Sequence, residues 1–151
     1  PESDYRYKIT ILVNKQDSTC IKAIVDASHD AARLEWPVSW DQALNMPLHD
    51  GIDKCASWDQ LADYLMCTFH SYHPPLLQMP DGSIMPRSIE IPIGASVRVF
   101  GAMGGCIVNG EKTIDCYLSG VQLLGSSTIA IEKSTVYERF EQLIDRYLPW
   151  R

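Results

Sequence analysis

The sequence lacks an excess of basic charge and long hydrophobic runs. Its 151 residues carry 13 lysines and arginines against 19 aspartates and glutamates, a net charge of −6. This excludes a strongly basic nucleic-acid footprint but leaves room for a local basic stripe. No apolar run approaches the roughly 18 residues of a membrane span, so we expect no membrane partner. A hydrophobic fraction of 46% and a charged fraction of 21% exclude a disordered chain and suit one compact domain.

Cysteine is present, but not in the pattern of a disulfide scaffold. The five cysteines are odd in number, scattered, and form no C-x-x-C pair. We therefore expect reduced thiols in an intracellular compartment. The N-terminal segment lacks the basic region and apolar core of a signal peptide. Because the chain starts at Pro1, we expect the single domain over 1–151 to be excised from a longer protein.

Motifs of common enzyme classes are missing as well. The sequence contains no G-x-S-x-G and no H-E-x-x-H, and the glycines of 101–105 lack the G-K-[ST] ending of a phosphate-binding loop. A nucleophile needs a base held against it, and no local signature supports such a pair. We expect a non-catalytic protein with no cofactor.

One spacing is compatible with a metal site. Cys67, His70 and His73 form C-x2-H-x2-H, and Cys55 lies upstream. Zinc takes such ligands tetrahedrally. However, Cys55 precedes the helix that we expect here, and Cys67 suits one face of that helix. We therefore favour structural and surface roles over a metal site.

Negative charge is concentrated in one segment. Eight acids and two bases lie between Asp26 and Asp63, which accounts for the whole net charge of the chain. The same region contains Trp36-Pro37, Met46-Pro47 and a Gly at 51. We interpret 27–56 as an acidic, irregular insertion with room for one short helix or strand.

Alternating apolar and polar residues predict a mainly β chain. The clearest alternation covers 5–13, and 19–25 is interpreted as the second strand of a hairpin. Further strands are expected at 88–91, 94–100, 113–118, 121–124 and 128–131. Pro80-Asp81-Gly82 is typical of a turn. The three glycines of 101–105 indicate a bend or a close backbone approach.

Capping boxes predict two helices. Ser57 and Gln60 open an apolar stripe at helical spacing that ends before Pro74, and a second stripe covers 134–148. This order of elements predicts a five-stranded OB-type β-barrel with an α-helix between strands 3 and 4 and a C-terminal helix. A ubiquitin-like grasp fold is the competitor, because it also starts with a hairpin followed by a helix.

Two segments carry a family resemblance. Residues 7–13, followed by 19–26, form a strand pair that ends in Ile24-Val25-Asp26, and 93–101 read I-G-A-S-V-R-V-F-G. Both segments resemble OB-fold domains of the telomere-end-protection and replication protein A families. The resemblance implies a domain of a complex that handles single-stranded DNA at chromosome ends in the nucleus. It also implies that the C-terminal helix packs against a partner subunit.

Direct binding of single-stranded DNA is one function that this fold offers. OB barrels stack aromatic side chains on bases and place cations along the phosphates. The residues that could do so here are Arg6, Lys8, Lys15, Lys22, Arg98, Phe100 and Lys112. Because the chain is acidic, we expect these cations to provide at most a weak phosphate track, and we keep direct binding as the alternative function.

Protein assembly is the function that the sequence favours. Tryptophan and tyrosine anchor interfaces, and acidic surroundings select a basic partner. The predicted partner-binding residues are Trp36, Trp40, Val136, Phe140, Leu143, Tyr147 and Trp150. We expect an assembly or dimerisation module that binds a protein partner or a second copy. A ubiquitin-like interaction domain and a small enzyme are less favoured.

Overall fold

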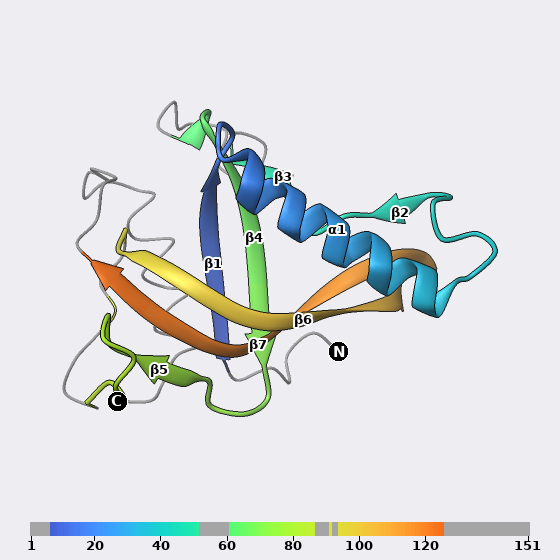
Figure 1. The fold of residues 1–151 in the computed structure, drawn as a ribbon. Coiled ribbons are helices and arrows are strands. Elements are labelled where there is room, and N and C mark those ends of the chain that lie inside the picture. The colour runs from blue at the N-terminus through green and yellow to red at the C-terminus, as the bar shows by residue number, and fades with distance from the viewer. Residues whose placement is uncertain (1–6, 52–60, 87–90, 92–93, 126–151) are drawn as a thin grey trace. The chain divides into compact units, whose positions relative to one another are not determined.

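The fold is mainly β. A computed structural model of the chain describes residues 7–51, 61–86, 91 and 94–125. The elements in chain order are β1 (Tyr7–Asn14), α1 (Ser18–Glu35), β2 (Leu44–Asn45), β3 (His49–Asp50), β4 (Tyr64–Ser71), β5 (Leu76–Gln78), β6 (Ser96–Val108) and β7 (Glu111–Gly125), as Figure 1 shows. In this described part, no helix is both long enough and apolar enough to span a membrane.

The strands share one sheet. β1, β4, β7 and β2 follow one another, β3 pairs with β4, and β5 and β6 both pair with β7. β2 and β5 run parallel to β7, whereas β3 runs antiparallel to β4. β1 and β6 each pair with one strand among those described, so the described sheet is not the closed five-stranded barrel that the sequence predicted.

The chain divides into two compact units, which we describe separately. Unit 1 comprises Pro1–Ile9, His70–Gly101 and Leu118–Arg151, and unit 2 comprises Thr10–Phe69 and Ala102–Tyr117. Strands β1, β4, β6 and β7 each have one part in unit 1 and the other in unit 2. The buried side chains described in unit 1 include Ile9, Met85, Leu118 and Val121.

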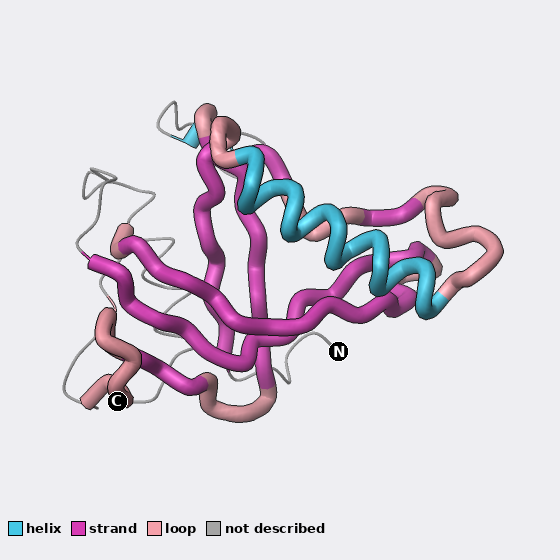
Figure 2. The backbone as a smooth tube through the Cα atoms, in the orientation of Figure 1, coloured by secondary structure: helices cyan, strands magenta, loops and turns pink. Residues whose placement is uncertain are grey.

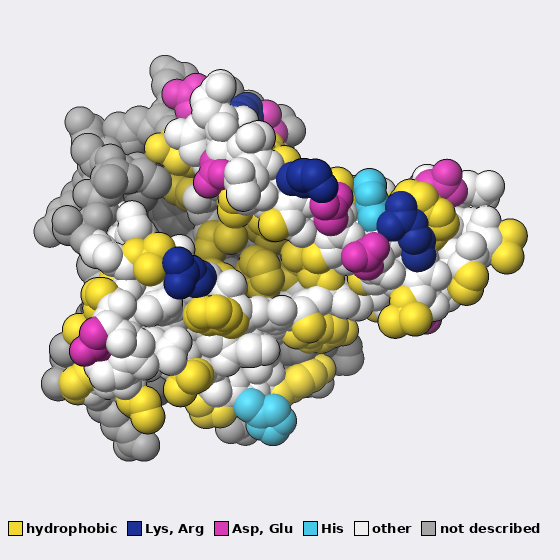
Figure 3. All heavy atoms as spheres, viewed as in Figure 1, with side chains coloured by type: hydrophobic (Ala, Val, Ile, Leu, Met, Phe, Trp, Pro, Cys, Tyr) yellow, Lys and Arg dark blue, Asp and Glu magenta, His cyan; other side chains and the backbone are white. Residues whose placement is uncertain are grey.

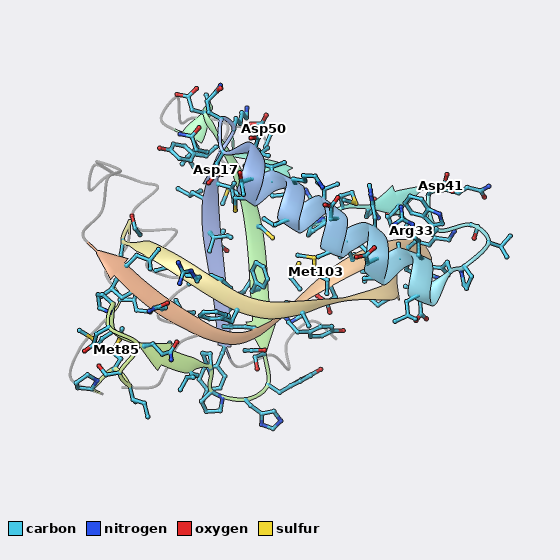
Figure 4. All side chains as sticks on the ribbon, viewed as in Figure 1. Asp17, Arg33, Asp41, Asp50, Met85 and Met103 are labelled. Carbon is cyan, nitrogen blue, oxygen red and sulfur yellow. The ribbon has the colours of Figure 1, made fainter. Side chains whose placement is uncertain are left out.

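Residues 18–35 form a helix, so the predicted strand at 19–25 is wrong, and so is irregular structure at 27–35. Asp17 caps α1 by accepting a hydrogen bond from the backbone N–H of Cys20 at 3.1 Å; it lies at the start of the helix in Figure 4. The buried residues of α1 are Ile24, Ser28, Ala31 and Ala32. Their spacing is helical, and burial of this face outweighs the strand preference of the β-branched residues before it.

α1 packs within unit 2 against β6 and β7. Ala31, Ala32 and Ile114 are buried together, and the half-buried residues around them are Trp36, Trp40, Leu44 and Met103. The Ser28 hydroxyl donates to the carbonyl of Ile24 at 2.7 Å and lies 3.3 Å from the sulfur of Met103. The first part of the acidic segment, residues 27–35, therefore belongs to α1, a helix with one buried face.

Residues 64–71 form a strand, so the predicted helix between strands 3 and 4 is wrong over this range. Met66, Cys67 and Phe69 are buried in β4, which lies between β1 and β7. Apolar side chains at Leu65, Cys67 and Phe69 also alternate with a period of two. The helical period of 3.6 residues and the strand period of two both fit this segment. Hydrogen-bonded strands on both sides select the strand. The Ser57 capping box lies outside the described residues.

β6 and β7 form one long hairpin (Figure 2). β6 contains residues 96–100 of the strand predicted at 94–100, and β7 contains the strands predicted at 113–118 and 121–124. Asn109 and Gly110, with φ of 51° and 80°, make the two-residue turn of the hairpin. The glycines of 101–105 lie inside β6 and give the close approach that was expected: a Cβ on Gly105 would lie 2.8 Å from the Trp36 ring.

The turn at 80–82 is confirmed, because the backbone N–H of Gly82 donates to the carbonyl of Met79 at 2.9 Å and Gly82 has φ of 87°. The predicted strand at 128–131 and the C-terminal helix at 134–148 lie outside the described residues, as does most of 88–91.

Candidate nucleic-acid interface

Two of the predicted DNA-binding cations are neutralised inside unit 2. Lys15 forms an ion pair with Asp50 at 2.8 Å, and Lys22 on α1 pairs with Asp26 one turn later. The carboxylate of Asp26 raises the pKa of Lys22 by hydrogen bonding and by its charge. Figure 3 shows basic and acidic side chains side by side on the outer face of α1. A cation already paired with a carboxylate attracts a phosphate weakly, so neither lysine stands out as a DNA contact.

A third cation of unit 2, Lys112, holds a loop in place. Its ammonium donates to the hydroxyl of Ser39 at 2.7 Å and also to the carbonyl of Ser39. The ammonium also stands over the ring of Trp36, 5.6 Å from the ring centroid. These contacts fasten the chain after α1 to β7, which gives Lys112 a structural role.

Arg98 in unit 1 has a different environment. It is exposed on β6, and its Nη1 donates to the side-chain Oε1 of Gln122 on β7 at 3.2 Å. Gln122 is neutral, and within the described residues no carboxylate lies within ion-pair distance of Arg98. The guanidinium is therefore held by one neutral acceptor and keeps its full charge and its other donors for an anion.

Phe100 lies two residues after Arg98 and so shares its face of β6. Its side chain is 43% exposed although it belongs to a strand. A Cβ on Gly120 would lie 3.7 Å from Cδ2 of Phe100 and 3.0 Å from the carbonyl oxygen of Leu76. A side chain at Gly120 would therefore meet Phe100 only at an ordinary van der Waals distance: the ring lies beside Gly120 on β7, and the carbonyl of Leu76 is the close neighbour that keeps this position small. Figure 1 shows β5, β6 and β7, which carry these residues.

The structure therefore brings together two of the predicted nucleic-acid residues, Arg98 and Phe100, and we call them with Gly120 and Gln122 the Arg98–Phe100 face. Lys8 is half-buried on β1, and Arg6 lies outside the described residues. Gly120 and Gln122 were missed in the sequence. A glycine inside a strand pattern could have marked a close approach, but the role of Gln122 follows only from strand pairing.

Comparisons with known proteins identify similar folds among solved structures. No family model matches the sequence, and no curated protein matches it. Among solved structures, the chain is similar to the single-stranded DNA-binding protein from bacteriophage Enc34, with 16% identity and a TM-score of 0.64 over 89% of this chain and 77% of that one. The same phage protein in complex with single-stranded DNA gives 16% identity and a TM-score of 0.66, over 83% and 74% of the two chains.

A C-terminal truncation of the phage protein also matches, with 16% identity and a TM-score of 0.63 over 82% of this chain and 72% of that one. The chain has a fold similar to that of a single-stranded DNA-binding protein. The resemblance to OB-fold proteins of this kind is confirmed at the level of the fold. Helix placement and a closed five-stranded barrel are not part of that agreement.

Two of the predicted partner-binding residues are engaged inside unit 2. The Trp36 ring packs against Gly105, and the Trp40 ring lies 5.1 Å from His29 and 4.3 Å from the guanidinium of Arg33. These contacts hold both half-buried tryptophans within unit 2. The remaining predicted partner residues, Val136, Phe140, Leu143, Tyr147 and Trp150, lie outside the described residues, so partner binding stays a prediction.

The C-x2-H-x2-H spacing of Cys67, His70 and His73 does not lie on the helix that was predicted for it. Cys67 and His70 lie on a strand, where residues three apart point to opposite faces, and not one helical turn apart. Cys67 is buried with its sulfur 4.0 Å from that of Cys116, and this contact together with burial raises the pKa of the Cys67 thiol. The described residues hold no cluster of three or more metal-ligating side chains, and Cys55 lies outside them.

Proposed function

We propose that this chain is a non-catalytic domain that binds single-stranded DNA directly, through the Arg98–Phe100 face of unit 1. The observation that carries the proposal is an exposed aromatic ring that packs against Gly120, beside an arginine whose charge no described carboxylate neutralises. The fold likeness supports it, because one of the similar structures is a protein in complex with single-stranded DNA.

The chemistry of this face suits an unpaired strand. Phe100 would stack on a base, a contact that every base offers because every base has a π-face. Arg98 would donate to the phosphate next to that base. Neither contact reads base edges, so the face predicts binding with little sequence preference.

Net charge limits how strongly phosphates contribute. Each phosphate contact on a single strand adds about −0.7 to the slope of log K against log salt. With a net charge of −6 and three of the described cations paired with acids, few such contacts are available. We expect a shallow salt dependence, with base stacking as the main source of affinity.

The test is fluorescence anisotropy with labelled oligonucleotides of thymidine, mixed sequence and G-rich sequence, at low and physiological salt. We expect saturable binding to all three, with a duplex of the same length bound more weakly. Absence of binding at low salt would contradict the proposal. A strong preference for the G-rich strand would instead support the chromosome-end role implied by the family resemblance.

Assembly is the wider role that the resemblance predicts. A complex at chromosome ends, a nuclear location and a protein partner or homodimer depend on that resemblance and on residues outside the described part. We retain them as predictions. Light scattering of the chain alone would test for the second copy.

A further inference from the structure

We propose that Gln122 is a positioning residue of the Arg98–Phe100 face, which presents Arg98 to a phosphate while leaving its charge intact. This inference rests on the function proposed above. The side-chain amide of Gln122 forms hydrogen bonds at both ends. Its Oε1 accepts a hydrogen bond from Arg98, and its Nε2 donates to two backbone carbonyls of the loop after β5.

The donors of Gln122 fix the orientation of its amide. Nε2 lies 3.4 Å from the carbonyl oxygen of Met79 and 3.2 Å from that of Pro80. Both loop groups are acceptors, so the NH₂ end of the amide must point toward them. Oε1 must therefore point the other way, toward the guanidinium of Arg98 at 3.2 Å.

The loop that anchors Gln122 is itself ordered. The backbone N–H of Gly82 donates to Met79, and the backbone N–H of Met79 donates to Ser83 at 2.8 Å. In the parallel register of β5 with β7, Gln78 stands opposite Gln122, and its side chain donates to the carbonyl of Gly82 at 3.2 Å. Gln122 thus connects an ordered turn to an exposed arginine.

The amide of Gln122 is also uncharged, and this matters for Arg98. A carboxylate in place of Gln122 would hold Arg98 equally well but would cancel its charge, as Asp26 and Asp30 do for cations on α1. An amide oxygen restrains the guanidinium and leaves the whole charge for a phosphate. Restraining the side chain before binding reduces the entropy lost on binding.

Two substitutions separate positioning from charge. Gln122→Met keeps the length of the side chain but removes its hydrogen bonds, so we expect affinity for a thymidine oligonucleotide to fall about threefold to tenfold with an unchanged salt slope. Gln122→Glu keeps an acceptor for Arg98 and adds a negative charge. Here we expect a larger loss and a salt slope that is shallower by about 0.7, the loss of one phosphate contact.

Gln78→Met is the matched control. It removes an amide that donates to the same turn but has no contact with Arg98, so we expect binding close to that of the wild type. A loss equal to that of Gln122→Met would show that the turn alone is responsible and would overturn the inference. Wild-type affinity in Gln122→Met, or an unchanged salt slope in Gln122→Glu, would also overturn it.

Failure of the proposed function has a different signature. If the wild-type chain does not bind the oligonucleotide, or if Arg98→Gln binds as the wild type does, the function proposed for this face is wrong. A measurement without DNA covers the case in which a Gln122 variant does not fold. NMR of the arginine side chains in the wild type should show restricted motion of the Arg98 guanidinium, and free rotation would overturn the inference.

Discussion

At the scale of single residues, aromatic rings lie beside glycines of β6 and β7. Phe100 lies beside Gly120 in unit 1, 3.7 Å from where a Cβ would be, and in unit 2 a Cβ on Gly104 would lie only 3.1 Å from the ring of the exposed Tyr117. A ring packed on a glycine covers backbone that would otherwise face water, and it is restrained before any ligand arrives. Restraint of this kind favours stacking, because less side-chain entropy remains to be lost.

Truncation of Phe100 tests the stacking contact. Base–aromatic stacking contributes about 1–3 kcal/mol per base, so Phe100→Ala should weaken binding to a thymidine oligonucleotide about fivefold or more. Ile84→Ala, at a side chain 75% exposed in the same unit, is the control and should leave the affinity unchanged. Equal losses of affinity in the two variants, measured by anisotropy, would show that Phe100 does not stack on a base.

A pair of charge-removing variants tests the role of Arg98. Arg98→Gln and Lys22→Gln each remove one exposed positive charge, but Lys22 is paired with Asp26. We expect Arg98→Gln to weaken binding several-fold and to make the salt slope shallower by about 0.7, with no change for Lys22→Gln. If both variants lose affinity to the same extent, net charge governs binding and the position of Arg98 does not.

At the scale of the elements, capping and hydrogen bonds of the turns can be recognised locally. Asp17 caps α1, Asn109 and Gly110 form the turn of the long hairpin, and Asp81 fixes the turn that supports Gln122. Each is a short-range interaction of a side chain or a glycine with neighbouring backbone. Of these, only the turn at Pro80-Asp81-Gly82 was predicted from the sequence.

The turn after β5 gives a pH prediction. Oδ1 of Asp81 accepts from the hydroxyl of Ser83 at 2.6 Å and from its backbone N–H at 2.9 Å, and these bonds hold the pKa of Asp81 below its ordinary value. The stabilisation is therefore present above the unfolded-state pKa and is lost as the pH falls through the folded-state pKa. Ser83→Ala should raise the Asp81 pKa toward that of an unfolded aspartate in a carboxyl NMR titration. A pKa that does not move would assign the shift to another contact.

At the scale of the whole molecule, two of the described thiols are buried and two are half-buried. Cys67 and Cys116 are buried in contact with each other. Burial is the main cause that raises the pKa of Cys20 and of Cys106, with nearby carboxylates adding to it. A thiol with a raised pKa is a poor nucleophile at neutral pH.

Alkylation followed by mass spectrometry tests this arrangement. In the native protein at neutral pH, Cys67 and Cys116 should react with iodoacetamide far more slowly than in denaturant, and Cys20 and Cys106 should be intermediate. Because the pKa values are raised, labelling of the intermediate pair should accelerate with increasing pH. Rapid native labelling of Cys67 would show that β4 is not buried as described.

The sequence by itself determined what depends on neighbours in the chain. Alternation predicted β1 and the parts of β6 and β7, glycine spacing predicted a bend or a close backbone approach in 101–105, and Pro80-Asp81-Gly82 predicted a turn. The sequence also placed Arg98 and Phe100 among the candidate nucleic-acid-binding residues. Its segments at 7–26 and 93–101 carried the resemblance to OB folds of single-stranded DNA-binding proteins. Each of these signals is a short-range property of backbone conformation or of strand parity.

Only the tertiary structure decided between helix and strand where both periods fit. The expected strand at 19–25 belongs to α1 because a face with Ser28 and Ala32 can be buried. The expected helix after Ser57 is β4 over 64–71 because β1, β3 and β7 pair with it. The candidate site depends on the same long-range pairing. Gly120 and Gln122 meet Phe100 and Arg98 only because β6 folds back on β7, and no pattern within either strand carries that register.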